Sequence, residues 1–205
     1  EFIKKDIYPC LKDIISTYKK GTDFSIYMDT DGLIHAGSGL DQVTWMDVRV
    51  GDWVATPRHG KPVEINALWY NALCTMDMLQ AKFGDNDDSY RQLASLVKAS
   101  FNKRFWNENT GCLYDVVDED DDTIRPNQIY AVSLPFTMPD MEREKAIVDT
   151  VMDKLYVGCG LRSLDPDHKD YHPIYIGSLS KRDHAYHQGT AWGFLLGGFI
   201  SAYVK

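Results

Sequence analysis

The chain has 205 residues, of which 44% are hydrophobic and 25% charged, and its formal net charge is −8 at pH 7. This size and composition are sufficient for one globular domain with a buried core, and we treat residues 1–205 as a single domain. The negative charge, without any Lys/Arg-rich run, argues against a nucleic-acid partner. No apolar run is long enough to cross a bilayer and no signal-peptide pattern is present, so no membrane contact is expected.

Cysteine and histidine spacing argues against a metal site. The four cysteines are far apart in the chain: Cys10, Cys74, Cys112 and Cys159. Free thiols in a reducing compartment are expected, which favours the cytoplasm. Four histidines lie close together without the spacing of a metal motif: His168, His172, His184 and His187. No phosphate-binding glycine loop is present, and no cofactor is expected.

The first elements are a helix and a hairpin. Apolar residues at helical spacing predict a helix over 1–20, which either kinks at Pro9 or begins there, and which ends at Gly21. Two short strands, Ser25–Met28 and Leu33–Ala36, are expected on either side of an Asp-Thr-Asp-Gly turn. Asp29 and Asp31 are turn residues first and a possible wall of a site second.

A long connection then leads into two helices. Gly37–Pro62 has little periodicity, and loops of this length in compact domains tend to be functional. A helix is expected from Pro62 to Gly84, followed by a polar turn over Asp85–Asp88. Asp88 or Ser89 is expected to cap the next helix, which continues to about Phe105.

The second half alternates loops and helices. We expect a loop and hairpin over 106–124, with a solvated acidic turn at Asp118–Asp122, and then a short helix from Pro126 to Pro135. A further helix is opened by Pro139 and Asp140. An irregular stretch over Gly158–Ser180 and a last helix from about His187 to Val204 complete the chain. Six helices joined by alternating short and long links can form helical hairpins of an α/α toroid, although no repeat is visible.

Aromatic and acidic residues gather on the stretch Thr44–Leu73, TWMDVRVGDWVATPRHGKPVEINALWYNAL. Trp45 with Asp47, and Asp52 with Trp53, lie on its loop. Aromatic rings stack on the apolar faces of pyranoses, and carboxyl groups move protons at a glycosidic oxygen. The stretch therefore favours a sugar site.

Four blocks, taken in order, resemble the amylo-α-1,6-glucosidase domain of glycogen debranching enzymes: the stretch just quoted, RPNQIYAVSLPF, GLRSLDP and RDHAYHQGTAW. Two departures occur in the last block, where His184 stands at a position often held by Gly and Ala191-Trp192-Gly193 replaces Val-Trp-Pro. The resemblance implies an (α/α)6 barrel and inverting hydrolysis of the glucose left at an α-1,6 branch point of glycogen or limit dextrin. No other partner than such an α-glucan is implied.

The resemblance also implies that the chain is part of a larger domain. A complete ring of about twelve helices would exceed this length, so the fold class expected is about half of an (α/α)6 toroid. The general base is expected in a downstream segment resembling S-E-I-F-D-G, which this sequence lacks. The isolated chain is then inactive, and exposed helix faces favour self-association or contact with the remainder of the domain.

Asp47 matches the position of the general acid in T-W-M-D. Trp45 and Met46 form an apolar lead-in that could desolvate it, although an Asp that merely caps a turn is the alternative. The residues assigned to substrate binding are Trp45, Asp52, Lys61, Glu64, Asn66, Trp69, Arg125, Asn127, Gln128, His187, Gln188 and Trp192. Helix capping, ion pairing (with Arg58 among the candidates) and loop hydrogen bonding are the structural alternatives for these polar groups.

Two other function classes stay open. One is a non-catalytic carbohydrate-binding or structural module that uses the same aromatic cleft. The other is a six-hairpin glycosidase that acts on a different α-glucan. If the chain does contain its own base, Asp52, Glu64 and Asp183 are the candidates.

Overall fold

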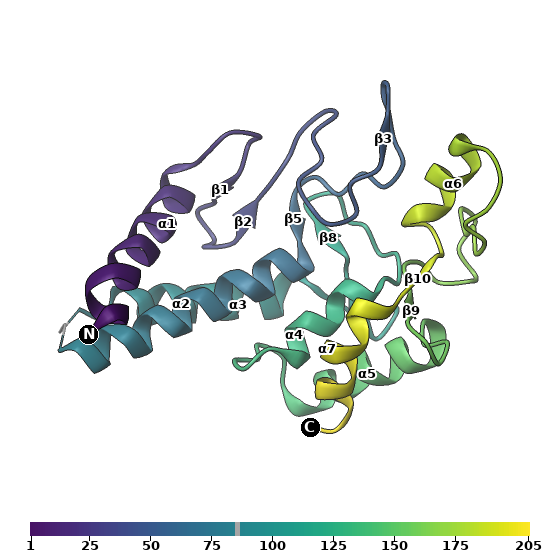
Figure 1. Ribbon diagram of the computed structural model, residues 1–205. Coiled ribbons are helices and arrows are strands. Elements are labelled where there is room, and N and C mark those ends of the chain that lie inside the picture. Colours follow the sequence, from purple (N-terminus) through teal and green to yellow (C-terminus); the bar gives the residue numbers. More distant parts are fainter. Residues whose placement is uncertain (85–86) are drawn as a thin grey trace.

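The protein is mainly helical, and its described residues form five two-stranded sheets in the connections. The computed structural model describes residues 1–84 and 87–205. Helices α1, α2 and α3 lie at one end of the molecule, helices α4, α5 and α7 lie at the other, and most of the short strands lie along one side (Figure 1). Helix α2 contacts members of both groups.

The N-terminal helix begins at the proline, as one of the two expected alternatives has it. Helix α1 spans Tyr8–Lys20 with Pro9 in its first turn, and a single π-helical turn, Ile3–Ile7, precedes it. Proline is tolerated there because the first-turn N–H groups have no intrahelical partner. The helix ends at Gly21, and the hairpin β1 (Tyr27–Met28) and β2 (Ile34–His35) follows, shorter than expected.

The long connection contains more structure than its sequence pattern indicated. Strands β3 (Arg49–Val50) and β4 (Trp53–Val54) form a hairpin around Gly51, whose φ is 58°. Strand β5 (Lys61–Pro62) pairs with β8 (Val116–Val117). These pairs are too short for alternation of apolar and polar residues to reveal them.

The two long helices agree closely with the expected boundaries. Helix α2 spans Val63–Phe83; Pro62 is its N-cap in an extended conformation, and left-handed Gly84 ends it. Helix α3 spans Ser89–Arg104. Asp88 takes the N-cap position without a side-chain cap, whereas Asp87 accepts from the backbone N–H of Ser89. The expected turn over Asp85–Asp88 lies partly outside the described residues.

The middle of the chain also follows the sequence pattern. Strands β6 (Trp106–Asn107) and β7 (Cys112–Leu113) form a hairpin. A 3-10 turn, Pro126–Ile129, leads directly into α4 (Tyr130–Ser133). Helix α5 (Met141–Lys154) is capped by Asp140, which accepts from the N–H of Arg143.

The C-terminal expectation was wrong in two respects. A helix that the sequence pattern did not indicate, α6 (Leu179–Tyr186), begins at the end of the expected irregular stretch and continues to just before His187, and the last helix, α7 (Leu196–Tyr203), begins later than His187. Between them β10 (Ala191–Trp192) pairs with β9 (Leu161–Arg162), and a 3-10 turn, Gly193–Leu195, follows. Strand β10 pairs with a strand distant in sequence, so the local pattern of apolar residues could not show where the last helix begins.

Gly189 explains why no helix continues from α6. Its φ is 141°, and a Cβ atom there would lie 2.8 Å from the carbonyl oxygen of His172. Only glycine adopts that conformation at so close an approach. The chain therefore turns at Gly189 and leads Trp192 back toward β9.

The core joins the helices on which the candidate site rests. Its fully buried members include Leu73, Val97, Phe101, Phe105, Ile129, Ile147 and Leu155. Burial of each such side chain contributes about 1.5–3 kcal/mol. Within the described residues, all four cysteines are free, and no helix has the length and apolar character to cross a membrane.

Candidate functional site

In the segment Trp45–Asp47 some side chains point into the protein and others into solvent. Met46 is buried, Trp45 is half-buried and Asp47 is exposed. The indole Nε1 of Trp45 donates to Asn127 Oδ1 at 2.7 Å. Trp45 and Met46 thus fix the backbone from which Asp47 projects. The expected desolvation of Asp47 by these two neighbours does not occur, because they turn inward while the carboxylate turns outward.

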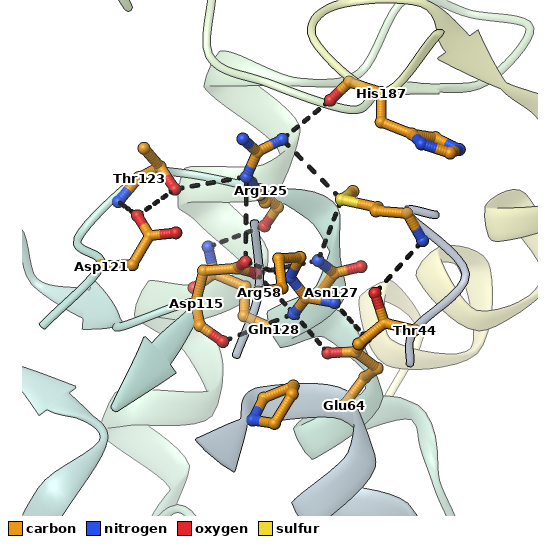
Figure 2. Close-up of polar contacts among 12 residues, drawn as sticks. Thr44, Arg58, Glu64, Asp115, Asp121, Thr123, Arg125, Asn127, Gln128 and His187 are labelled. Carbon is orange, nitrogen blue, oxygen red and sulfur yellow. Dashed lines mark hydrogen bonds and ion pairs between the residues drawn. The ribbon is translucent and has the colours of Figure 1, made fainter. Parts of the chain in front are cut away.

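Arg58 lies between the buried acids Asp115 and Glu64, as Figure 2 shows. Its Nε donates to Asp115 Oδ2 at 2.6 Å, and its Nη2 donates to Asp115 Oδ1 at 3.2 Å. Its two terminal nitrogens also donate to the two carboxylate oxygens of Glu64, with Nη2–Oε2 at 2.6 Å. The side chain of Arg58 is only 2% exposed and that of Glu64 4%. Both oxygens of Glu64 are therefore already bonded within the protein.

The charges of Arg58, Asp115 and Glu64 stabilise one another. Burial alone would lower the pKa of Arg58, but the carboxylates of Asp115 and Glu64 outweigh it and hold the pKa above its ordinary value. Removing one partner of such a buried pair leaves an uncompensated charge, which costs about 3–5 kcal/mol. Arg58 therefore holds the start of α2 against β7 and β8.

Arg125 connects the same region to the C-terminal segment. Its Nη1 donates to the carbonyl oxygens of Ser163 at 3.0 Å and His187 at 2.8 Å, and its Nη2 donates to Gln188 Oε1 at 2.7 Å. Burial lowers the pKa of Arg125, and the positive charge of Arg58 lowers it further against the opposing effect of Asp115. These bonds place His187 and Gln188 beside the 3-10 turn.

Two amides complete the group of polar contacts. Asn127 donates to Asp115 Oδ1 at 2.8 Å while its own oxygen accepts from Trp45. Gln128 accepts from the N–H of Leu113 and donates to the carbonyl of Arg125. Asp115 is thus linked to Trp45 through a single amide side chain. We call Arg58, Glu64, Asp115, Arg125 and Asn127 the buried polar network.

An aromatic cluster adjoins the network through Trp45 and His187. The ring of Trp45 makes edge contacts with His187 at 5.2 Å, Trp192 at 5.7 Å and Phe194 at 5.1 Å between centroids. Phe194 is 56% exposed, so this cluster reaches the surface. Aromatic rings presented in this way suit the apolar face of a sugar ring.

His187 is the buried member of this cluster. Burial, with the positive charges of Arg125 and Arg58, lowers the pKa of His187 from 6.5 to about 4. Among the described residues no group hydrogen-bonds its Nδ1. Its imidazole lies outside the polar contacts, while its carbonyl accepts from Arg125 (Figure 2). The ring is therefore neutral at neutral pH and carries a polar atom without a partner in the described part.

Three of the expected binding residues face other parts of the protein. Asn66 donates to the carbonyls of Ile34 and Pro62 and accepts from the N–H of Ile34, and Trp69 donates to the carbonyl of Gly32. Both side chains are buried against the β1–β2 hairpin. The structural alternative accounts for all of these contacts.

Lys61 is the third residue placed away from the network. It is buried, and its Nζ lies 2.8 Å from Asp29, 3.0 Å from Asp31 and 3.4 Å from Asp118. Burial alone would lower the pKa of Lys61, but Asp29 and Asp31 raise it overall. Asp118 therefore belongs to an ion cluster with Lys61, rather than only to a solvated turn.

The structure brings together most of the other expected residues. The network and the aromatic cluster contain Trp45, Glu64, Arg125, Asn127, His187 and Trp192, with Gln128 and Gln188 adjoining them. Asp52 is exposed at the turn of β3 and β4. Sequence reasoning missed Asp115 and Phe194. Asp115 lies at the bend between β7 and β8, and the sequence signal that could have identified it is a lone acid within the otherwise uncharged run Cys112–Val117.

Comparison with known proteins identifies the family. Residues 1–205 match the amylo-α-1,6-glucosidase family, so the chain belongs to that family. It is similar to the glycogen debranching enzyme of Saccharomyces cerevisiae, with 29% identity over 233 aligned positions. That alignment covers 90% of this chain and 15% of the yeast protein. The resemblance seen in the sequence motifs is confirmed.

Proposed function

We propose that the chain is part of a glycoside hydrolase domain that hydrolyses α-1,6 branch points of glycogen or limit dextrin. One observation carries this proposal: Asp47 projects to solvent from a segment that Asn127 anchors and that lies beside exposed aromatic rings. An acid held rigidly next to a stacking surface can protonate a glycosidic oxygen.

Inverting hydrolysis requires a second carboxylate about 6.5–9.5 Å from the first, with room for water. Glu64 is poorly suited to that task because both its oxygens bind Arg58. We propose that the general base comes from sequence beyond these 205 residues, and that the helices form about half of an (α/α)6 toroid. The exposed Asp47 would then be enclosed by the remainder of the domain and by substrate, which together would hold its proton.

The test is Asp47→Asn in a longer protein that contains this chain and the rest of its domain. Glucose release from limit dextrin should fall by roughly 10²- to 10⁴-fold, since a general acid contributes that much, while glycogen binding is retained. The matched control is Asp122→Asn, which changes an exposed acid of the acidic turn. Unchanged glucose release in the Asp47 variant would eliminate the assignment.

The 205-residue chain alone should release no glucose. Measurable release that Asp47→Asn abolishes would place a base within the chain. Asp52 and Asp183 would be the first residues to replace, because the carboxylate of Glu64 is already bonded to Arg58.

A non-catalytic glucan-binding role is the second candidate. The ion pair between Arg58 and Glu64 favours this role, because Glu64 is then not available as a second catalytic carboxylate beside Asp47. The two roles separate in the same experiment, because a binding module would retain both glycogen binding and whatever activity the longer protein has after Asp47→Asn.

A further inference from the structure

A groove along α6 is lined by two histidines, one of which stacks on the adjoining Trp53. It encloses about 500 Å³ and is lined by His172, Pro173, Ile174, Ile176, Ser180, Lys181 and His184. No step of the proposed reaction uses these residues. The groove adjoins the β3–β4 hairpin, which belongs to the same loop as Asp47.

Trp53 and His184 form the aromatic pair. Their rings stack with centroids 4.2 Å apart and planes 26° from parallel. Trp53 remains 37% exposed although one of its faces packs on the imidazole. The contact joins residues far apart in the sequence and fixes the orientation of the indole. A rigid, partly exposed indole binds the apolar face of a sugar with little loss of side-chain entropy.

The two histidines of the groove present hydrogen-bond acceptors. Nδ1 of His172 lies 2.7 Å from the carbonyl of Asp170, and Nδ1 of His184 lies 2.7 Å from the carbonyl of Ser180. A carbonyl oxygen only accepts, so Nδ1 carries the hydrogen in both rings and Nε2 of the neutral ring holds a lone pair. No group in the described part of the chain hydrogen-bonds either Nε2 atom.

Other groups of the groove add the remaining chemistry of sugar recognition. Ser180 supplies a hydroxyl and Lys181 an ammonium group, while Ile174 and Ile176 supply exposed apolar surface, at 67% and 68% exposure. Neutral sugars bind through such a mixture of acceptors, donors and apolar contacts, since their hydroxyl groups both donate and accept.

We propose that this groove and the adjoining Trp53 form an accessory subsite for a linear α-1,4-glucan chain, distinct from the point at which Asp47 acts. The proposal rests on the proposed function for the identity of the sugar. The indole of Trp53 stacks on one glucose unit, and the Nε2 atoms of His172 and His184 accept from hydroxyl groups of neighbouring units. The subsite holds an outer chain of the branched substrate while the branch point reaches Asp47.

The test measures maltoheptaose binding to the 205-residue chain by titration calorimetry. Trp53→Ala should weaken binding about tenfold, the loss that corresponds to one stacking contact. His184→Phe keeps a ring against Trp53 but removes the acceptor, so it should weaken binding by a smaller factor. Tyr203→Ala, at an exposed aromatic residue of α7, is the matched control and should bind like the unchanged chain.

Three outcomes would overturn the subsite: no maltoheptaose binding by the chain at millimolar concentration while its circular dichroism is native, unchanged affinity of both Trp53→Ala and His184→Phe, or an equal loss in Tyr203→Ala. None of these outcomes bears on glucose release by the longer protein. Conversely, failure of the Asp47 assignment leaves the affinity measurements intact, so the two proposals can fail separately.

Discussion

At the scale of single residues, the site is defined by which polar groups are already bonded within the fold. Glu64 and Asp115 share Arg58, and Asn127 divides its amide between Asp115 and Trp45. These groups cannot bind a sugar without giving up a partner. Their contribution is to fix Trp45 and the segment that carries Asp47. The groups open to a ligand are instead Asp47, Phe194 and the Trp53–His184 pair.

His187 makes the stability of the protein depend on pH between about pH 4 and pH 6.5. Its pKa is about 4 in the fold, against an ordinary value of 6.5, so the unfolded chain binds more protons between these values. The free energy of unfolding therefore rises with pH across this window. The contribution of His187 is fully present above about pH 6.5 and is lost as the pH falls toward 4.

We predict that acidification from pH 7 to pH 5 lowers the free energy of unfolding by about 2 kcal/mol through this residue. His187→Phe keeps a ring against Trp192 and should remove that part of the dependence. Urea denaturation of both proteins at the two pH values measures the difference. An equal pH dependence in the two proteins would show that His187 titrates normally in the fold.

At the scale of elements, short strand pairs position the site more than the helices do. Strand β5 leads directly into α2, and its pairing with β8 brings Arg58 and Glu64 beside Asp115. Gly60 makes the approach possible. Its φ is 104°, and a Cβ atom there would lie 2.8 Å from the carbonyl oxygen of Val117.

Gly60→Ala is therefore expected to destabilise the protein by more than about 1 kcal/mol, because both the conformation and the contact exclude a methyl group. Gly197→Ala is the control, since Gly197 lies in α7 with open space where a Cβ would stand. That change should stabilise the protein by roughly 0.5–1 kcal/mol. Thermal unfolding of both variants measures these changes in stability. A Gly60→Ala protein as stable as the unchanged chain would contradict the close approach of Gly60 to Val117.

At the scale of the whole molecule, helices α1 and α2 leave apolar surface exposed between them. The groove between these helices encloses about 260 Å³ and is lined by Ile14, Ile15, Tyr18, Ile34, Ile65, Leu68, Trp69 and Ala72. Ile14 is 51% exposed and Leu68 45%. Contiguous apolar surface of this kind promotes association.

We predict that the isolated chain self-associates through this α1–α2 groove. Leu68→Glu should shift it toward the monomer in sedimentation velocity at micromolar concentration, because the change places a charge in the apolar surface. Met141→Glu alters a more exposed residue of α5, at 84% exposure, and should leave association unchanged. A chain that is monomeric before any substitution would refute the prediction.

The sequence was sufficient for the family and for most helix boundaries. Helix α2 begins after a proline and ends at a glycine, and Asp140 caps α5. These residues set the helix ends through the backbone next to them in sequence, so the sequence pattern predicts those ends. The C-terminal region could not be read in this way. There, Trp192 pairs with Leu161 across the chain, and Gly189 allows the turn only because His172 lies against it.

For the candidate site too, the sequence predicted some features and the tertiary structure was needed for others. Sequence alone placed Trp45, Asp47, Arg125 and Asn127 in one group through long motifs of uncommon residue types. Only the tertiary structure decided that Asn66 and Trp69 face the β1–β2 hairpin, that Asp47 is exposed, and that Asp115 completes the network. The reason is physical: a motif fixes which groups are present, whereas burial and hydrogen-bond partners depend on segments that meet only after folding.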